Sequence, residues 1–167
     1  MWSYSDRLML FLLLKIIRPL FVHIISKNCF HLKGPGAGVK TALGQVRKAL
    51  TTNAFRYVIR IDIASYYASI DRTILQAQIT SQFNDLRLCR YLHDIITIGI
   101  EKNGVISVPN KGIPVRSSLS PFFGALYLSP LDKAFEFRHG VFYARFMDDG
   151  VPRTQNNREN GNFVMLH

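Results

Sequence analysis

A stretch of alternating side chains over residues 55–63 is the feature that most constrains the fold of this chain. Five aromatic or isoleucine residues alternate there with mostly polar ones, the last of which is Asp62. A period of two predicts a β-strand with one buried face and places Asp62 on the other face, near the strand's end. A second predicted strand, residues 141–146, leads into Asp148-Asp149-Gly150, which has the turn chemistry of a β-hairpin.

The remaining segments indicate helices joined by loops. Helical spacing or apolar runs predict helices over residues 6–25, 39–50, 72–83, 86–98 and 120–128, and residues 104–108 are expected to form a short strand near a hairpin. Asp71 and Ser120 are suitable N-caps, the latter because Pro121 follows it. Pro19 is expected to bend or end the first helix, and Pro130 to kink or restart the last one. Residues 33–38 hold three glycines and a proline, which indicates a loop.

The first predicted helix is apolar nearly all round. Residues 8–14 are strongly apolar, but charged residues and Pro19 interrupt the run, whereas a bilayer span needs about 20 nearly uncharged residues. Asp6 and Arg7 precede the run and no small-residue cleavage site follows it, which argues against a signal peptide. We expect a helix buried in the core and no stable membrane association. A membrane-anchored helical protein is the alternative.

The charge is divided unevenly along the 167 residues. The formal net charge is +10, and residues 1–60 hold ten basic side chains against the single acid Asp6, whereas the rest is nearly neutral. This asymmetry favours a polyanion bound beside a separate carboxylate site. Cys29 and Cys89 lie 60 positions apart without any CxxC pattern, which excludes a zinc ribbon and a disulfide-rich scaffold. We therefore expect a reducing compartment, the cytoplasm.

Three acids could form a metal site. Asp62 at one strand end and Asp148 and Asp149 at a neighbouring hairpin could converge on a divalent cation, since hard cations prefer oxygen ligands. Each acid also has an ordinary interpretation: Asp-Asp-Gly is a common solvated turn, and Asp62 could pair with Arg60 or Arg56. The order of the motifs along the chain favours the site.

That order resembles the reverse transcriptase family, in particular its bacterial group II intron-like branch, from about residue 6 to residue 150. Residues 60–71, Arg-Ile-Asp-Ile-Ala-Ser-Tyr-Tyr-Ala-Ser-Ile-Asp, resemble the first palm motif. Residues 111–121, Lys-Gly-Ile-Pro-Val-Arg-Ser-Ser-Leu-Ser-Pro, resemble the second, and residues 143–149, Tyr-Ala-Arg-Phe-Met-Asp-Asp, resemble the third. Residues 6–21 and 33–42 resemble the later fingers segment.

The resemblance implies an α+β fold: a polymerase palm whose antiparallel sheet has helices packed on one face, plus a partial helical fingers region. The expected divisions are a partial fingers region over residues 1–54, a palm over 55–151 and a polar, disordered tail over 152–167. The first fingers segment has no counterpart here, and the switch after Val151 resembles a frameshifted or truncated reading frame. We therefore expect a truncated copy that polymerises poorly or not at all.

The resemblance also assigns the metal site. Asp62, Asp148 and Asp149 would be the catalytic acids. Asp62, Asp148 and the carbonyl of Ile63 would hold Mg²⁺, of which two ions are expected.

Nucleotide-binding positions follow in the same way. Tyr67 would be the steric gate whose ring fills the space of a ribose 2′-hydroxyl, and Tyr66 is expected to pack in the core because strand alternation turns the two rings apart. Val115 and Arg116 stand where the family has Gln and Gly along the incoming nucleotide. Val115 loses a polar contact, and Arg116 adds bulk or a phosphate contact.

The implied activity is RNA-directed DNA polymerisation, in which a primer 3′-hydroxyl attacks the α-phosphate of a dNTP. The expected partners are an RNA template, a DNA primer and dNTPs. Lys33, Lys40, Arg47 and Lys48 are the candidate nucleic-acid contacts, and a solvated basic face is the alternative interpretation of these four residues. A non-catalytic nucleic-acid-binding remnant of such an enzyme remains the second hypothesis.

Overall fold

The computed structural model describes residues 2–32, 38–51, 57–59, 61, 63–102, 105–108, 110–115, 117–147, 149–150 and 153–154. The chain divides into two units. The first unit comprises Met1–Ile24 and Ser65–Tyr127, and the second comprises Ile25–Ala64 and Leu128–His167. The chain thus passes from one unit to the other three times. The fingers, palm and tail boundaries expected from the sequence stay predictions.

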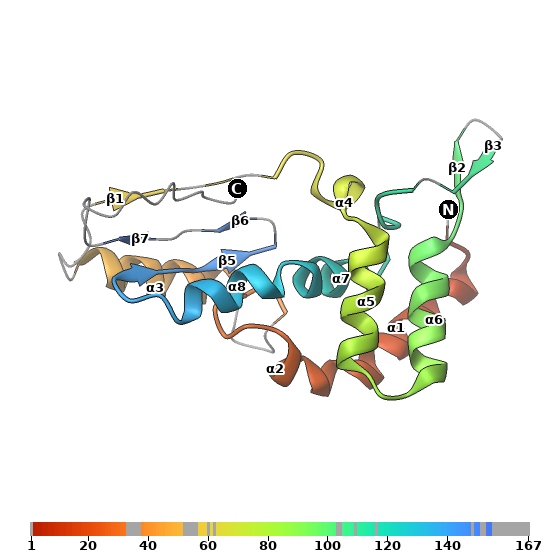
Figure 1. Ribbon diagram of the computed structural model, residues 1–167, viewed down its shortest axis with the longest axis horizontal. Coiled ribbons are helices and arrows are strands. Elements are labelled where there is room, and N and C mark those ends of the chain that lie inside the picture. The colour runs from red at the N-terminus through yellow and green to blue at the C-terminus, as the bar shows by residue number, and fades with distance from the viewer. Residues whose placement is uncertain are drawn as a thin grey trace. The chain divides into compact units, whose positions relative to one another are not determined.

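The first unit consists mainly of helices (Figure 1). In chain order its elements are α1 (Tyr4–Ile17), the 3₁₀ turn η1 (Arg18–Leu20), α2 (Phe21–Ile24), α4 (Tyr66–Ser69), α5 (Arg72–Gln82), α6 (Leu86–Thr97), β2 (Ile100–Lys102), β3 (Val105–Ser107) and α7 (Ser120–Tyr127). The β2 and β3 strands pair antiparallel as a hairpin. Pro19 lies within η1, so the predicted long helix is interrupted there, as expected from its missing N–H.

Helix starts in this unit follow from local side-chain chemistry. Asp71 Oδ1 accepts hydrogen bonds from the backbone N–H of Thr73 (2.9 Å) and Ile74 (3.3 Å), which confirms Asp71 as the N-cap of α5. Asp85 caps α6 in the same way. The α5 and α6 helices lie side by side in Figure 1.

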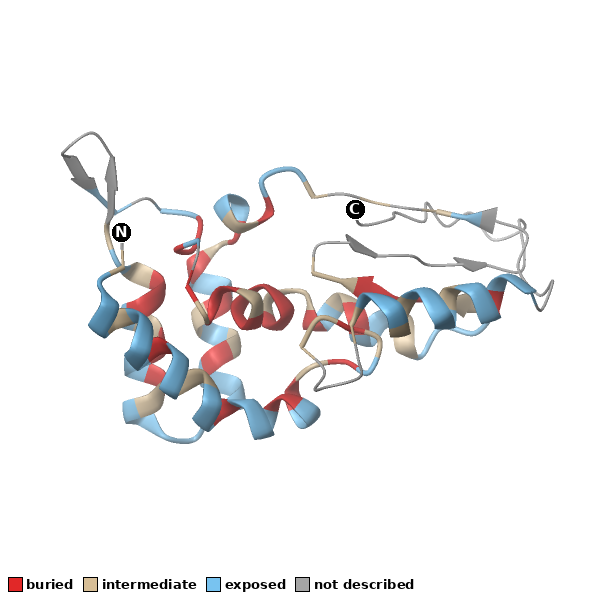
Figure 2. Ribbon diagram, turned by 180° about the vertical axis from the view of Figure 1, so that it is seen from behind, coloured by how far each residue is buried: buried red, intermediate tan, exposed pale blue. Residues whose placement is uncertain are grey.

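The core of the first unit is built around α7. Figure 2 shows this helix buried along most of its length, and aromatic rings from two other segments pack on its residue Phe122. The Phe21 ring stacks on Phe122 with the centroids 4.5 Å apart, and Phe83 meets Phe122 edge-on at 6.2 Å. Aromatic pairs at these separations each contribute about 0.5–1.5 kcal/mol beyond the area that they bury.

The expectation that the first helix is buried is wrong for most of its residues. Only Leu10 and Ile17 of α1 are buried. An exposed apolar face remains, made of Leu8, Met9, Phe11, Leu12 and Ile16. An apolar run without periodicity indicates burial but not which side a neighbour covers, and here the neighbours cover one narrow side. No described helix is long and apolar enough to cross a bilayer.

The second unit combines two helices with very short strands. Its elements are α3 (Val39–Thr51), β1 (Tyr57–Val58), α8 (Ser129–Glu136), β4 (Val141–Phe142), β5 (Arg145–Phe146), β6 (Asp149–Gly150) and β7 (Arg153–Thr154). One antiparallel ladder has the order β1-β7-β4, and β5 pairs with β6 in another. Pro130 falls in the first turn of α8, so the proline restarts a helix.

These short ladders do not amount to the palm sheet that the sequence predicts. Of the predicted strand 55–63, the structure describes β1 and a few neighbouring positions, and residues 55, 56, 60 and 62 lie outside the description. The predicted strand 141–146 is two separate strands, β4 and β5, which belong to different ladders. Of the predicted tail, the backbone of Arg153–Thr154 is described, as β7.

The hairpin before Gly150 exists but turns one residue earlier than predicted. Arg145 pairs with Gly150 and Phe146 with Asp149, and Met147 follows β5 directly as a turn residue. Met147 has a positive φ of 60°, which is the conformation that tight hairpin turns use. The turn is therefore set by a methionine conformation that the Asp-Asp-Gly pattern does not reveal.

The α3 helix matches its predicted range within one residue, but its apolar side is largely uncovered. Ala49 is its single buried residue among those described, and Val39, Leu43 and Leu50 are each about half exposed. Periodicity predicted the helix correctly, whereas the cover over its apolar side depends on distant segments.

Candidate active site

The acids that define the predicted metal site fall largely outside the described residues. Asp62 and Asp148 are not described, and of Asp149 the backbone alone is, within β6. Ile63 is half-buried. Within the described part of the chain, no three His, Cys, Asp or Glu side chains lie together as a metal-binding group. The predicted convergence of the acids stays a prediction.

The two tyrosines of the first motif are described in full, in the first unit. They lie on the short helix α4, where consecutive residues are rotated by about 100° instead of alternating as in a strand. Their ring centroids are 5.4 Å apart and the rings are tilted by 49°. Tyr66 is buried and its hydroxyl donates to the carbonyl of Gly124 (2.6 Å), which confirms the expected core role. Tyr67, the predicted gate, is half-buried.

Gly124 makes room for both tyrosines on α7. A Cβ at this position would lie 3.1 Å from Cε1 of Tyr66 and 3.3 Å from Cε1 of Tyr67. A side chain at this position would require the two rings to shift by a few tenths of an ångström. The sequence shows this glycine within a helical pattern, but not the aromatic pair that requires it.

The loop that carries Val115 is fastened to the segment that carries Tyr67. The Ile113 N–H donates to the carbonyl of Tyr67 (2.9 Å), and the Gly112 N–H donates to the carbonyl of Ile70 (2.8 Å). Gly112 has a φ of +87°, and a Cβ there would lie 2.9 Å from the carbonyl oxygen of Ala68. This close backbone approach requires glycine.

Val115 follows this junction and is 58% exposed. Its side chain is thus accessible, as a contact with a nucleotide requires. Arg116 lies outside the described residues.

Two polar side chains brace the same loop. Arg72 is 6% exposed, and its Nε donates to the Gly112 carbonyl (2.6 Å). Burial lowers the pKa of Arg72. The Ser120 hydroxyl donates to the Pro114 carbonyl (2.6 Å). Ser120 is the first residue of α7 and its hydroxyl holds the loop, which corrects its predicted role as an N-cap.

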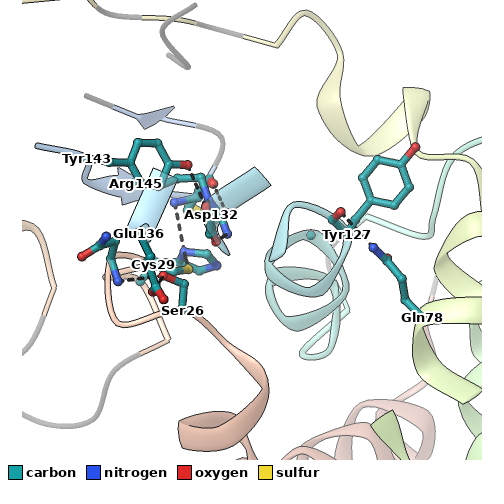
Figure 3. Close-up of polar contacts among 12 residues, drawn as sticks. Ser26, Cys29, Gln78, Tyr127, Asp132, Glu136, Tyr143 and Arg145 are labelled. Carbon is teal, nitrogen blue, oxygen red and sulfur yellow. Dashed lines mark hydrogen bonds and ion pairs between the residues drawn. The ribbon is translucent and has the colours of Figure 1, made fainter. Parts of the chain in front are cut away.

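A buried ion pair organises the second unit (Figure 3). Arg145 Nη2 and Nε donate to Asp132 at 2.5 and 2.8 Å, and both side chains are fully buried. The Tyr143 hydroxyl donates to the same carboxylate (2.7 Å). Burial, together with the negative charge of Asp132, raises the pKa of Tyr143. Burial is the largest single effect on Arg145 and lowers its pKa, but the hydrogen bonds with Asp132 and the charges of the neighbouring groups together raise the pKa of the guanidinium.

The same arginine reaches the residue before Asp148. Arg145 Nη1 donates to the Met147 carbonyl (2.6 Å), and the Met147 N–H donates to Nδ1 of His31 (3.0 Å). Sequence reasoning missed His31, Asp132 and Arg145. The one available signal was a charged residue, Arg145, inside an otherwise apolar predicted strand.

The candidate nucleic-acid contacts lie mainly on α3. Lys40, Arg47 and Lys48 are exposed, and positions 40 and 47 share one face because they are about two helical turns apart. Lys33 lies outside the described residues.

No protein-family model matches the chain, and no curated protein matches it. Among solved structures, it is similar to an apo telomerase from Candida tropicalis truncated from its C-terminal domain, with a TM-score of 0.50 and 18% identity over 90% of this chain and 34% of that one. Chains of a partial and a complete Cas6-RT-Cas1–Cas2 complex match at a TM-score of 0.40 and 21% identity over 77% of this chain, covering 22% and 14% of theirs. The chain thus spans about a third or less of the length of these three solved chains. The telomerase match shows a likeness of fold.

Proposed function

We propose that this chain is the palm region of a reverse transcriptase, an RNA-directed DNA polymerase related to the bacterial group II intron-like branch. Two independent lines support the proposal. The fold resembles that of a telomerase, and three motifs with the residue types of a polymerase palm follow one another in the family's order. The coarser relationship to nucleic-acid polymerases rests on the fold, and the finer one rests on the motifs.

The observation that carries the proposal is the junction between the first two motifs. Two backbone hydrogen bonds join the loop at Gly112 and Ile113 to the carbonyls of Ile70 and Tyr67. These bonds hold residues that are more than 40 positions apart in one small region of the first unit. A steric gate and a nucleotide-lining residue must share such a region, because they contact the same substrate.

Within this proposal the half-buried Tyr67 ring excludes a ribose 2′-hydroxyl and so selects dNTPs over NTPs. Val115 contributes an apolar contact to the nucleotide, and Arg116 contributes a positive charge toward its phosphates. Gly124 and the buried Tyr66 limit the movement of the Tyr67 ring, since that ring lies against the glycine and beside the Tyr66 ring.

The metal site proposed here consists of Asp62, Asp148 and the carbonyl of Ile63, with Asp149 as a further acid. This donor set fits Mg²⁺, a hard cation that takes carboxylate and carbonyl oxygens together with substrate phosphates. Two bound ions would supply charge stabilisation to an attacking 3′-hydroxyl and to the leaving pyrophosphate. In this proposal the acidic residues of the metal site and the basic residues that contact nucleic acid are two separate groups.

The proposed nucleic-acid surface is the exposed basic side of α3, with Lys40, Arg47 and Lys48, together with Lys33. Each phosphate neutralised on duplex nucleic acid steepens the plot of log affinity against log salt by about 0.9. Replacing all four with glutamine should therefore reduce the slope by up to about 3.6. An unchanged slope would assign these charges to solvation alone.

Primer extension on an RNA template with Mg²⁺ and dNTPs tests the proposed activity. The chain is compared with Asp148→Ala, and Tyr67→Ala is tested for incorporation of NTPs. Extension that disappears in Asp148→Ala, with NTPs accepted by Tyr67→Ala, supports the proposal. Extension that is equal in the chain and in Asp148→Ala overturns it.

A second candidate function is nucleic-acid binding without catalysis. Val115 favours this candidate, because an apolar side chain stands where the family places the amide of a glutamine. Background extension in both proteins, combined with salt-dependent binding through the α3 charges, would support the remnant.

A further inference from the structure

Met147, the residue before Asp148, is held by side chains at both of its backbone groups. Its N–H donates to His31 Nδ1 at 3.0 Å, across 116 residues of sequence. Its carbonyl accepts from Arg145 Nη1 at 2.6 Å. The β5–β6 ladder ends at the Phe146–Asp149 pair, immediately before Met147. The two side chains therefore hold the backbone at the point where ladder hydrogen bonds stop.

The conformation of Met147 needs such supports. Its φ of +60° is unfavourable for a residue with a long side chain, and such conformations persist only where the surroundings fix them. Two directed hydrogen bonds to the same residue supply that constraint.

The supports are themselves well anchored within the second unit. Arg145 is 1% exposed and is held by the Asp132 carboxylate, to which Tyr143 also donates (Figure 3). The backbone of Arg145 exchanges hydrogen bonds with Asn28 and Phe30, each at 2.8 Å. His31 follows Phe30 directly, so the same backbone contact that fixes the arginine also fixes the histidine.

We propose that His31, acting with the Arg145–Asp132 pair, is a positioning residue for the turn that carries Asp148 and Asp149. The proposal rests on the proposed function, in which these acids bind metal. Because an N–H can only donate, His31 Nδ1 must be unprotonated and accept, which leaves the other ring nitrogen to carry the proton in the neutral imidazole. The histidine contributes a hydrogen-bond acceptor to the turn and contacts no metal.

The acceptor and the ring of His31 can be separated by two variants. His31→Asn places a carbonyl oxygen close to the position of Nδ1 and keeps the acceptor. His31→Phe keeps an aromatic ring, and so the edge contact with Phe146 at 6.0 Å, but removes the acceptor. His93→Phe is the matched control, because it makes the same change on α6 in the first unit.

Nuclear magnetic resonance on the full, isotope-labelled chain tests the positioning directly. A coupling through the hydrogen bond between the Met147 amide and His31 Nδ1 is expected in the unaltered chain, and this measurement needs no variant. The order parameters of the Met147 and Asp149 amides should fall in His31→Phe toward about 0.6 or below, from the value of about 0.85 found in rigid backbone. His31→Asn and His93→Phe should leave them unchanged.

Titration with Mn²⁺ as a paramagnetic probe connects this order to metal binding. The affinity should fall about 10- to 100-fold in His31→Phe, as is typical when a support behind a metal ligand is lost, and His31→Asn should restore it. Absence of the coupling, equal order in His31→Phe and the unaltered chain, or equal losses in the Asn and Phe variants would each overturn the proposal. Equal Mn²⁺ affinity of the unaltered chain and Asp148→Ala would instead overturn the metal site, while the order parameters would still decide the positioning role.

Discussion

Removing one partner of the buried Arg145–Asp132 pair should destabilise the second unit severely. Both side chains are 0% exposed, so solvent does not screen the attraction between the two charges. Asp132→Leu leaves a buried guanidinium that has lost its carboxylate and still donates to the Met147 carbonyl, and Arg145→Met leaves a buried carboxylate that accepts from Tyr143. Such losses cost about 3–5 kcal/mol, a large part of the roughly 5–15 kcal/mol that stabilise a domain.

The double variant Asp132→Leu with Arg145→Met should lose much less than the sum of the two single variants. It removes both charges together and replaces them with apolar side chains, which is often neutral or even stabilising in a buried site. A double-mutant cycle should therefore give a coupling free energy of several kcal/mol, above the 0.5–3 kcal/mol usual for residues in contact.

Hydrogen exchange at the Phe30 amide measures this stability within the correct unit. This amide donates to the Arg145 carbonyl, and its free energy of exchange reports opening of the second unit. The Gly112 amide, bonded to Ile70 in the first unit, is the internal reference. Single variants that cost less than about 1 kcal/mol, as exposed ion pairs do, or losses that simply add, would refute the reasoning.

Three further predictions concern local features. Gly112→Ala should destabilise the first unit by about 1–3 kcal/mol or more, because Gly112 has a φ of +87° and lies against the Ala68 carbonyl. Gly44→Ala, at an uncrowded position on α3, should instead stabilise the protein by about 1 kcal/mol. Denaturant unfolding of the two variants measures both changes. Hydrogen bonds with the side chain and the backbone of Ser3 hold the pKa of Asp6 below 3.8. The stabilisation of α1 by Asp6 is therefore present above pH 3.8 and is lost as the pH falls through the lowered pKa. A carboxyl titration by NMR should show this. Burial raises the pKa of Tyr143, so its contribution to stability is complete below about pH 10 and fades above it, and an absorbance titration should leave Tyr143 un-ionised until the protein unfolds.

Local chemistry predicted most of the helices in this chain. Asp71 caps α5 because a carboxylate can reach N–H groups two and three residues ahead, which the sequence alone reveals. Pro130 restarts a helix for a reason equally local. The capping box of Ser3 and Asp6 also lay in the sequence, although the predicted start at residue 6 missed it.

Long-range partners could not be predicted. The Tyr66 hydroxyl bonds to Gly124 across 58 positions and the Met147 N–H bonds to His31 across 116, and no periodicity relates such pairs. The prediction that α1 is buried was wrong for the same reason, since an apolar run does not indicate which segments pack against it. Of the candidate site, the sequence predicted Tyr66 as a core residue, but not the glycine and the loop that hold Tyr67.

Stability and positioning should separate in the double variant Asp132→Leu with Arg145→Met. Apolar replacement can keep the second unit folded, so protection at the Phe30 amide should stay near that of the unaltered chain. The same change removes the donor to the Met147 carbonyl, and neither leucine nor methionine can replace it. Order at the Asp149 amide should therefore fall although the unit remains stable. If order at Asp149 stays high in a stable double variant, the ion pair serves packing alone, and His31 by itself must hold the turn.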